Sequence, residues 1–342
     1  MESILVLTHV NESGSALTKA SLEAVTAGVE LAARLAAPLA IGIVGANAAG
    51  SAGPLAQTGA QLLVASGEAF AQARYSTDAA ACEALCRAAQ ASLVLAPASS
   101  RFARVAAGVA HRVGGFIDTH VTAIGGDGTI EANRCFYRQR IEAVIRRDLR
   151  PWFLLLDAGT HAAYAGAPGD ANVEKIEATL PTIRTTVTGV REPMPSAQTI
   201  KPDAKMLFVA GAGWTKKQPD GKTHTDEAAE TILGFLARSG ASLGSSKSLV
   251  DQAGENQQVL PFLTHLNQIG QTGATPRHPK GLATCCHGEE PHVVGWRFVQ
   301  ERRAISLDPN CGWTRGKADV VYIADAFPVM AEVNRLLGSG NK

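Results

Sequence analysis

Apolar residues follow two alternating patterns along the first half of the chain. Short runs rich in branched residues are typical of buried strands, and they occupy residues 4–10, 39–45, 60–65 and 91–99. Apolar positions at helical spacing lie between and after them, at residues 15–35, 77–90 and 101–115. Strands separated by helices of this length are expected to pair in parallel through right-handed crossovers.

The pattern changes after residue 115. Residues 119–159 predict successive strands with a turn at "GGDG" and a last core strand in "RPWFLLLDAG". Periodicity then fades over 162–203, which contains Pro and Gly. We expect a linker there, with one strand at 176–192 that crosses to a partner or to a second domain.

A second α/β unit follows the linker. "KMLFVAGAGW" (205–214) predicts a strand that enters a Gly-rich turn. Helices are predicted at 225–240 and 328–340, and the further strand candidates are 241–251, 281–286, 302–309 and 318–325. The predicted fold class is α/β with two doubly wound units, a nucleotide-binding-like parallel sheet in residues 1–200 and a Rossmann-like domain in 201–342.

Composition narrows the function classes. The 342 residues are 46% hydrophobic and 18% charged, which is enough apolar material for two cores. Lys plus Arg number 32 against 31 for Asp plus Glu, so overall charge gives no argument for nucleic acid or a membrane surface. No basic leader follows Met1, and no apolar run approaches the ~20 residues that cross a bilayer. We expect a cytoplasmic protein without membrane insertion.

Two Gly-containing loops are candidates for ligand binding. "GAGW" after the strand at 205–210 has the context of a dinucleotide loop, but G-x-G alone favours an ordinary turn. "QIGQTG" (268–273) can present amides and a hydroxyl to a ligand, although plain turns share this pattern. "SSK" (245–247) places two hydroxyls and a cation at a strand end, which favours a functional interpretation.

Cysteine, histidine and arginine clusters give weaker signals. Cys285, Cys286, His287, His292 and Cys311 lack metal-ligand spacing, so no metal site is predicted. Nucleophilic Cys with a His base depends on unseen geometry. Cys82 and Cys86, one helical turn apart, are expected to be buried thiols. The arginines of 134–150 suit a solvated sheet face, with a partner or phosphate contact as the alternative.

The order of these segments resembles the alpha subunit of electron transfer flavoprotein. "ILVLTHV", "LVLAPAS" and "IDTHVTAI" are similar to that family's first domain, and "LGSSKSLVD", "NQIGQTG", "AISLDP" and "ADVVYIAD" are similar to its flavin-binding domain. The similarity covers nearly the whole chain.

The resemblance implies a heterodimer with an electron transfer flavoprotein beta subunit. FAD would be held non-covalently by the C-terminal domain and would carry electrons from a flavin dehydrogenase to a downstream electron acceptor. By position, Ser246 and Lys247 would lie near the isoalloxazine, and Gly270, Gln271 and Thr272 would line the flavin or its ribityl chain. Asp325 and Ala326 would approach the adenosine end, and the implied set also includes Gly288, His292 and Ser306.

Several positions depart from the family pattern. Gly213 and Lys247 stand where arginines are usual, and Ser306 stands where an asparagine is expected. "CHGEEPHV" replaces the family's Gly-Ile-Ser-Gly-Ala-Ile-Gln-His segment, of which Gly288 and a shifted His292 remain. Two functions are therefore open: an electron-carrying subunit that retains FAD, or a non-flavin scaffold subunit of an oxidoreductase complex with a degenerate or reused site.

Overall fold

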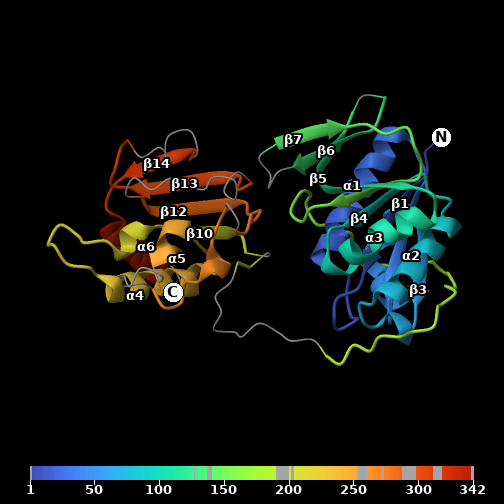
Figure 1. Ribbon diagram of the computed structural model, residues 1–342, viewed down its shortest axis with the longest axis horizontal. Coiled ribbons are helices and arrows are strands. Elements are labelled where there is room, and N and C mark those ends of the chain that lie inside the picture. The colour runs from blue at the N-terminus through green and yellow to red at the C-terminus, as the bar shows by residue number, and fades with distance from the viewer. Residues whose placement is uncertain are drawn as a thin grey trace. The chain divides into compact units, whose positions relative to one another are not determined.

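The computed structural model folds into two compact units, Met1–Val190 and Arg191–Lys342 (Figure 1). The structure describes residues 2–126, 128–136, 141–189, 200–201, 204–252, 260–270, 273–286, 298–310 and 318–339, with the side chains of 285–286 left out. Both units are mixed α/β, with a parallel-rich sheet in each. The predicted fold class of two Rossmann-like doubly wound units is confirmed.

The sheet of the first unit has nine strands in the order β7-β6-β5-β8-β4-β1-β2-β3-β9. The strands are β1 (Ile4–His9), β2 (Leu39–Gly45), β3 (Gln61–Ser66), β4 (Leu93–Pro97), β5 (Phe116–Gly125), β6 (Glu131–Phe136), β7 (Ile141–Ile145), β8 (Trp152–Leu156) and β9 (Val173–Lys175). Along the sheet, all neighbouring strands from β5 to β9 pair in parallel. At the other edge, β6 pairs antiparallel with β5, and β7 pairs antiparallel with β6. The last core strand predicted from "RPWFLLLDAG" is β8, which is buried along its whole length.

Helices cover both faces of this sheet. Helix α1 (Lys19–Leu35) contributes to one core cluster, while α2 (Tyr75–Ala88) and α3 (Ser100–Arg112) contribute to the cluster on the other face. The approach of α1 is close, because a Cβ built on Gly28 would lie 2.2 Å from Cγ2 of Val6. A side chain at position 28 would therefore push the helix off β1.

The strand predicted at 176–192 is wrong for its described part. The last strand of the first unit is instead β9. Its pairing with β3 ends where the Ile176 N–H donates to the Val64 carbonyl at 2.9 Å. Residues 176–189 form no strand. The chain leaves the sheet edge there, and Pro181 has no N–H for a ladder. We call residues 176–181 the strap, because they lie beside α2 and form one wall of a surface pocket.

The sheet of the second unit is parallel throughout its described strands. Its order is β11-β10-β12-β13-β14, formed by β10 (Met206–Ala210), β11 (Ser242–Ser245), β12 (Lys280–Cys286), β13 (Glu301–Ser306) and β14 (Val320–Ile323). Helices α4 (Thr225–Ser239) and α6 (Ala326–Ser339) pack together in the core cluster on one face. The strand candidate at 241–251 is correct only to Ser245, because Ser246 caps the short helix α5 (Lys247–Asp251).

The second sheet ends at an exposed strand. Among the described residues only β13 pairs with β14. Val320, Tyr322 and Ile323 are 41%, 43% and 54% exposed, so this edge presents apolar side chains to solvent. None of the described helices has the length and apolar content needed to cross a membrane.

Candidate functional site

The strand order of the second sheet creates a switch point between β10 and β12. The chain passes from β10 outward to β11 and then returns to β12 on the other side, so the connections leave these two strands in opposite directions. Crevices at the carboxyl ends of such strands are where open α/β sheets bind ligands. The described members of the predicted site all lie at this edge or beside it.

The turn after β10 is filled by the protein's own aromatic side chain. Residues Ala212–Thr215 form a buried single turn of 3-10 helix. The Trp214 indole is fully buried and donates from Nε1 to Oγ1 of Thr284 at 2.8 Å. It also packs against the Phe327 ring in a tilted arrangement, with ring centroids 4.6 Å apart. Since Thr284 lies on β12, this hydrogen bond links the two strands of the switch point. "GAGW" is thus an ordinary strand-end turn in this structure.

Ser246 and Lys247 lie at the carboxyl end of β11. Oγ of Ser246 accepts a hydrogen bond from the Leu249 N–H at 3.2 Å and so caps α5, while the Ser246 N–H donates to the Ala210 carbonyl at 2.9 Å. The Lys247 ammonium forms an ion pair with Asp251 one turn later. Asp251 also lies 3.8 Å from the His265 ring. The predicted cation is present at this strand end, and a carboxylate offsets its charge.

The loop that contains Gly270 folds back on itself. Gly270 has φ of 79°, a conformation that glycine adopts without the steric cost other residues incur. Its N–H donates to the Ala274 carbonyl at 2.8 Å, and the Gly273 N–H donates back to the Gly270 carbonyl at 2.6 Å. A parallel bridge between Gln268 and Ser245 brings the loop beside Ser246. Gln271 and Thr272 lie outside the described residues.

Ser306, Asp325 and Ala326 lie at the ends of the neighbouring strands β13 and β14. Ser306 is fully buried, and its hydroxyl donates to the Asp308 carbonyl at 3.1 Å. Oδ1 of Asp325 accepts the Phe327 N–H at 2.9 Å, so this carboxylate caps α6. Ala326 begins that helix and is buried.

The candidates thus form two groups on either side of the switch point. Ser246, Lys247 and Gly270 lie at β11, while Ser306 and Asp325 lie at β13 and β14. With strands ~4.8 Å apart, the two groups are separated by roughly 14–19 Å along the sheet edge. Only an elongated ligand would contact both. Gly288 and His292, which the sequence predicts for this site, lie outside the described residues.

The first unit has a comparable switch point that the sequence analysis missed. Its strand order reverses between β1 and β4, whose carboxyl ends carry His9 and Ser99. Nε2 of His9 lies 2.8 Å from Oγ of Ser99, and Nδ1 lies 2.9 Å from the Val10 carbonyl. Burial lowers the pKa of His9, which favours the neutral ring. The available signal was a polar residue at the end of one buried strand and another shortly after the end of a second.

A buried ion pair lies in the same region of the first unit. Arg101 donates to both carboxylate oxygens of Asp78, at 3.0 and 2.6 Å, and to the Phe70 carbonyl at 2.7 Å. Asp78 also accepts the Arg74 N–H at 3.0 Å. The network pairs the charges of Asp78 and Arg101 with each other within the protein.

The described arginines of 134–150 are paired rather than free. Arg134 and Arg147 donate to the buried Asp118, which also accepts the Trp152 indole N–H at 2.9 Å. Burial by itself would raise the pKa of Asp118, but the hydrogen bonds from Arg147 and Trp152 outweigh it and hold the pKa below its usual value. The remaining described arginines, Arg146 and Arg150, pair with Glu131 and Glu2. Arg138 and Arg140 lie outside the described residues.

The cysteines whose side chains the structure describes are buried. Cys82 and Cys86 are buried in α2, as expected, and burial raises the pKa of both thiols, to about 12 for Cys86. Within the ranges that the structure describes, no three His, Cys, Asp or Glu side chains are grouped as metal ligands. The side chains of Cys285 and Cys286, and all of His287, His292 and Cys311, fall outside those ranges.

One comparison with known proteins gives a match. A family model described as "Electron transfer flavoprotein domain" matches residues 6–181, slightly more than half of the chain and nearly all of the first unit. A comparison with curated individual proteins gives no match.

Proposed function

Because this chain belongs to the electron transfer flavoprotein family, we propose that it is the alpha-type subunit of a heterodimer with a beta subunit. In this proposal the carboxyl edge of the second sheet holds FAD. The complex takes electrons from a flavin dehydrogenase and delivers them to a downstream acceptor. Bound FAD would supply the ability to accept and release electrons one or two at a time.

The observation that carries the proposal is the placement of the candidate residues. Positions that are far apart in sequence, among them Ser246, Gly270, Ser306 and Asp325, meet one edge of one parallel sheet around its switch point. Sequence similarity alone does not require that arrangement. An elongated dinucleotide has the length to reach both groups.

The side chains at the two ends suit the two ends of such a ligand. A carboxylate such as Asp325 accepts hydrogen bonds from ribose hydroxyls, which is the usual role of an acidic residue at the end of a Rossmann-like strand. At the other end, Lys247 would place positive charge near the ring system and stabilise its anionic reduced form. Its pairing with Asp251 would moderate that effect.

The spectrum of the heterodimer tests the proposal. Co-expression with the beta subunit and gentle purification should give a yellow complex with one flavin per heterodimer. The Lys247→Ala complex should keep its flavin but show a lower reduction potential, because a cation near the reduced ring is lost. Lys280→Ala is the matched control, since Lys280 is an exposed lysine of the same unit at the opposite end of β12. An equal shift in both variants would contradict the role of Lys247.

One observation favours the scaffold function instead. Trp214 and its hydrogen bond to Thr284 close the switch point with the protein's own side chain. A colourless, flavin-free heterodimer that still associates with a dehydrogenase would support a non-flavin docking subunit. Stoichiometric iron or zinc in that preparation would indicate a reused site.

A further inference from the structure

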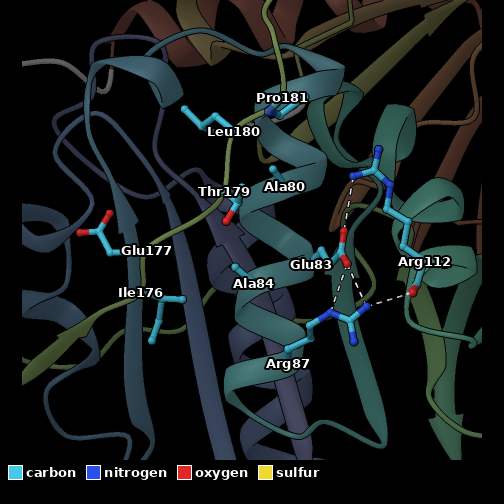
Figure 2. A pocket seen from close by; sticks show the side chains of 10 residues that line it. All are labelled: Ala80, Glu83, Ala84, Arg87, Arg112, Ile176, Glu177, Thr179, Leu180 and Pro181. Atoms are coloured by element: carbon cyan, nitrogen blue, oxygen red, sulfur yellow. Dashed lines mark hydrogen bonds and ion pairs between the residues drawn. The ribbon is translucent and has the colours of Figure 1, made fainter.

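A pocket in the first unit lies between helix α2, the end of α3 and the strap. Its volume is about 580 Å³. Figure 2 shows the strap on one side of α2 and Arg112, the last residue of α3, on the other, with its guanidinium turned toward Glu83; all three elements contribute lining residues. Neither the predicted flavin site nor the family match assigns a role to this pocket.

The wall that α2 contributes is shaped by small residues. Ala80 and Ala84 are one helical turn apart, so they lie on the same face and leave a trough along it. Ile176, Leu180 and Pro181 of the strap form an apolar wall opposite them (Figure 2). Leu180 is 38% exposed, so an apolar surface remains accessible at the mouth of the pocket. The trough suits an apolar or aromatic body.

The same pocket carries an excess positive charge at one side. Oε1 of Glu83 accepts from Nε and Nη2 of Arg87, at 3.1 and 2.9 Å, and its Oε2 lies 3.5 Å from Nη1 of Arg112. One carboxylate thus faces two guanidinium groups, which leaves one positive charge uncompensated within this cluster. The Arg87 side chain is 60% exposed, and its Nη1 donates to no described residue. A donor is therefore available to a ligand.

The remaining acidic residue of the pocket does not cancel this charge. Glu177 lies on the strap, points away from α2 in Figure 2, and forms an ion pair with Lys175 at 2.6 Å. The carbonyl of Arg112 at the end of α3 accepts a hydrogen bond from Arg87 at 3.1 Å, so a donor also satisfies the negative end of that helix.

We propose that this pocket binds a small amphipathic anion, with one carboxylate or phosphate group on an apolar or aromatic body. The anionic group contacts Arg87 and Arg112, and the body lies in the trough between Ala84 and the apolar wall of the strap. Because the described strap residues after Ile176 make no backbone–backbone hydrogen bonds, the ligand also fixes the strap against α2.

Fluorine NMR on the full-length chain tests the proposal with a matched pair of probes. We expect 4-fluorobenzoate to broaden and shift on titration to about 10 mM, while 4-fluorobenzamide, which has the same body without the charge, binds at least about tenfold more weakly. Phenyl phosphate and inorganic phosphate then separate the two anionic groups and the contribution of the body. Hydrogen exchange of residues 176–181 should slow in 4-fluorobenzoate alone.

Three variants locate the binding. Arg87→Gln should weaken 4-fluorobenzoate binding at least about tenfold, the effect of one charge-assisted hydrogen bond. Ala84→Leu should abolish it by filling the trough, and leucine is tolerated in a helix. Arg104→Gln, a control on α3 whose side chain donates to the Ala73 carbonyl outside the pocket, should bind as the unaltered chain does. Equal binding of the benzamide, no effect of Arg87→Gln, or no benzoate binding would overturn the proposal. If Ala84→Leu fails to fold, the Arg87 variant and the probe pair still decide.

Discussion

The two units close their switch points with different chemistry. In the first unit the carboxyl ends of β1 and β4 are joined by His9 and Ser99, near the buried pair of Asp78 and Arg101. In the second unit Trp214 links the turn after β10 to Thr284 of β12. The first crevice is closed by a satisfied polar network, and the second by one large aromatic side chain with polar candidates on both sides. Similar strand topology therefore produces a structural element in one unit and a candidate ligand edge in the other.

The units also differ in how their histidines respond to protons. Burial lowers the pKa of His9 in the first unit. In the second unit His224 is partly exposed, and its hydrogen bonds to Asp220 and Glu227 raise its pKa. Folding therefore favours the neutral form of one ring and the charged form of the other.

The largest expected effect is on the second unit. Trp214→Ala removes a fully buried indole, its packing against the Phe327 ring and its hydrogen bond to Thr284. We expect a loss of about 3–5 kcal/mol in the free energy of unfolding of this unit. Native-state hydrogen exchange, resolved by peptide, should show faster exchange in β10 and β12.

Trp214→Phe is the matched control, because it keeps a ring in the core and loses the N–H donor. Its destabilisation should be clearly smaller than that of the alanine variant. First-unit peptides should exchange unchanged in both variants. An equal decrease in the free energy of unfolding in the two variants would show that the hydrogen bond, rather than the packing of the ring, stabilises this switch point.

A smaller effect is expected in the first unit. Ser99→Ala removes the cap of α3 and the hydroxyl that contacts His9. The cost should be about 1 kcal/mol, measured as faster exchange in α3 and at the end of β1. Ser100→Ala, a change at the exposed neighbouring position, should have little effect. Equal exchange rates in the Ser99→Ala and Ser100→Ala variants would show that the contact between His9 and Ser99 does not stabilise the first unit.

The smallest expected effect is a pH dependence of stability that has opposite signs in the two units. His9 has a folded-state pKa below its unfolded value of about 6.5, so its contribution is present above that pH and is lost as the pH falls below it. His224 has a raised folded-state pKa, so its contribution is present below about 6.5 and is lost as the pH rises through the folded value.

Between pH 7.5 and 5.5 we therefore expect exchange to speed up in the first unit and to slow down in the second, after correction for intrinsic rates. His9→Gln should reduce the first trend without removing it, because burial also lowers the pKa of His161. His224→Gln should remove the second trend. The same sign of change in both units would contradict the assignment.

Local sequence patterns predict the helices and strands of this fold well. They predict less well which distant residues pack against each element. The strand at 39–45 is predicted to the residue, because an apolar run between turn residues needs no further information. The strand at 176–192 fails, since its apolar residues pack toward α2 instead of pairing at a sheet edge. Trp214 was assigned to a turn correctly, but its burial depends on Phe327 and Thr284, which are far away in the sequence.

The candidate site shows the same division. The hydroxyls and cation of residues 245–247 at a strand end indicated Ser246, whereas Ser306 and Asp325 were implied only by the family resemblance. The structure brings all three residues to one sheet edge. The pairing of Lys247 with Asp251 was accessible from their spacing of four, once α5 is recognised as a helix rather than a strand. The pocket beside α2 could not be predicted, because it joins residues about ninety positions apart through the path of the strap.

The exposed edge at β14 has a consequence for handling the chain. Unpaired backbone groups beside apolar side chains are a template for strand addition between molecules, and natural sheets usually block such edges with charge or proline. Val320, Tyr322 and Ile323 provide no such protection. Chain produced alone should therefore lose solubility as its concentration rises, and a charged residue at position 323 would be the conservative way to keep it in solution.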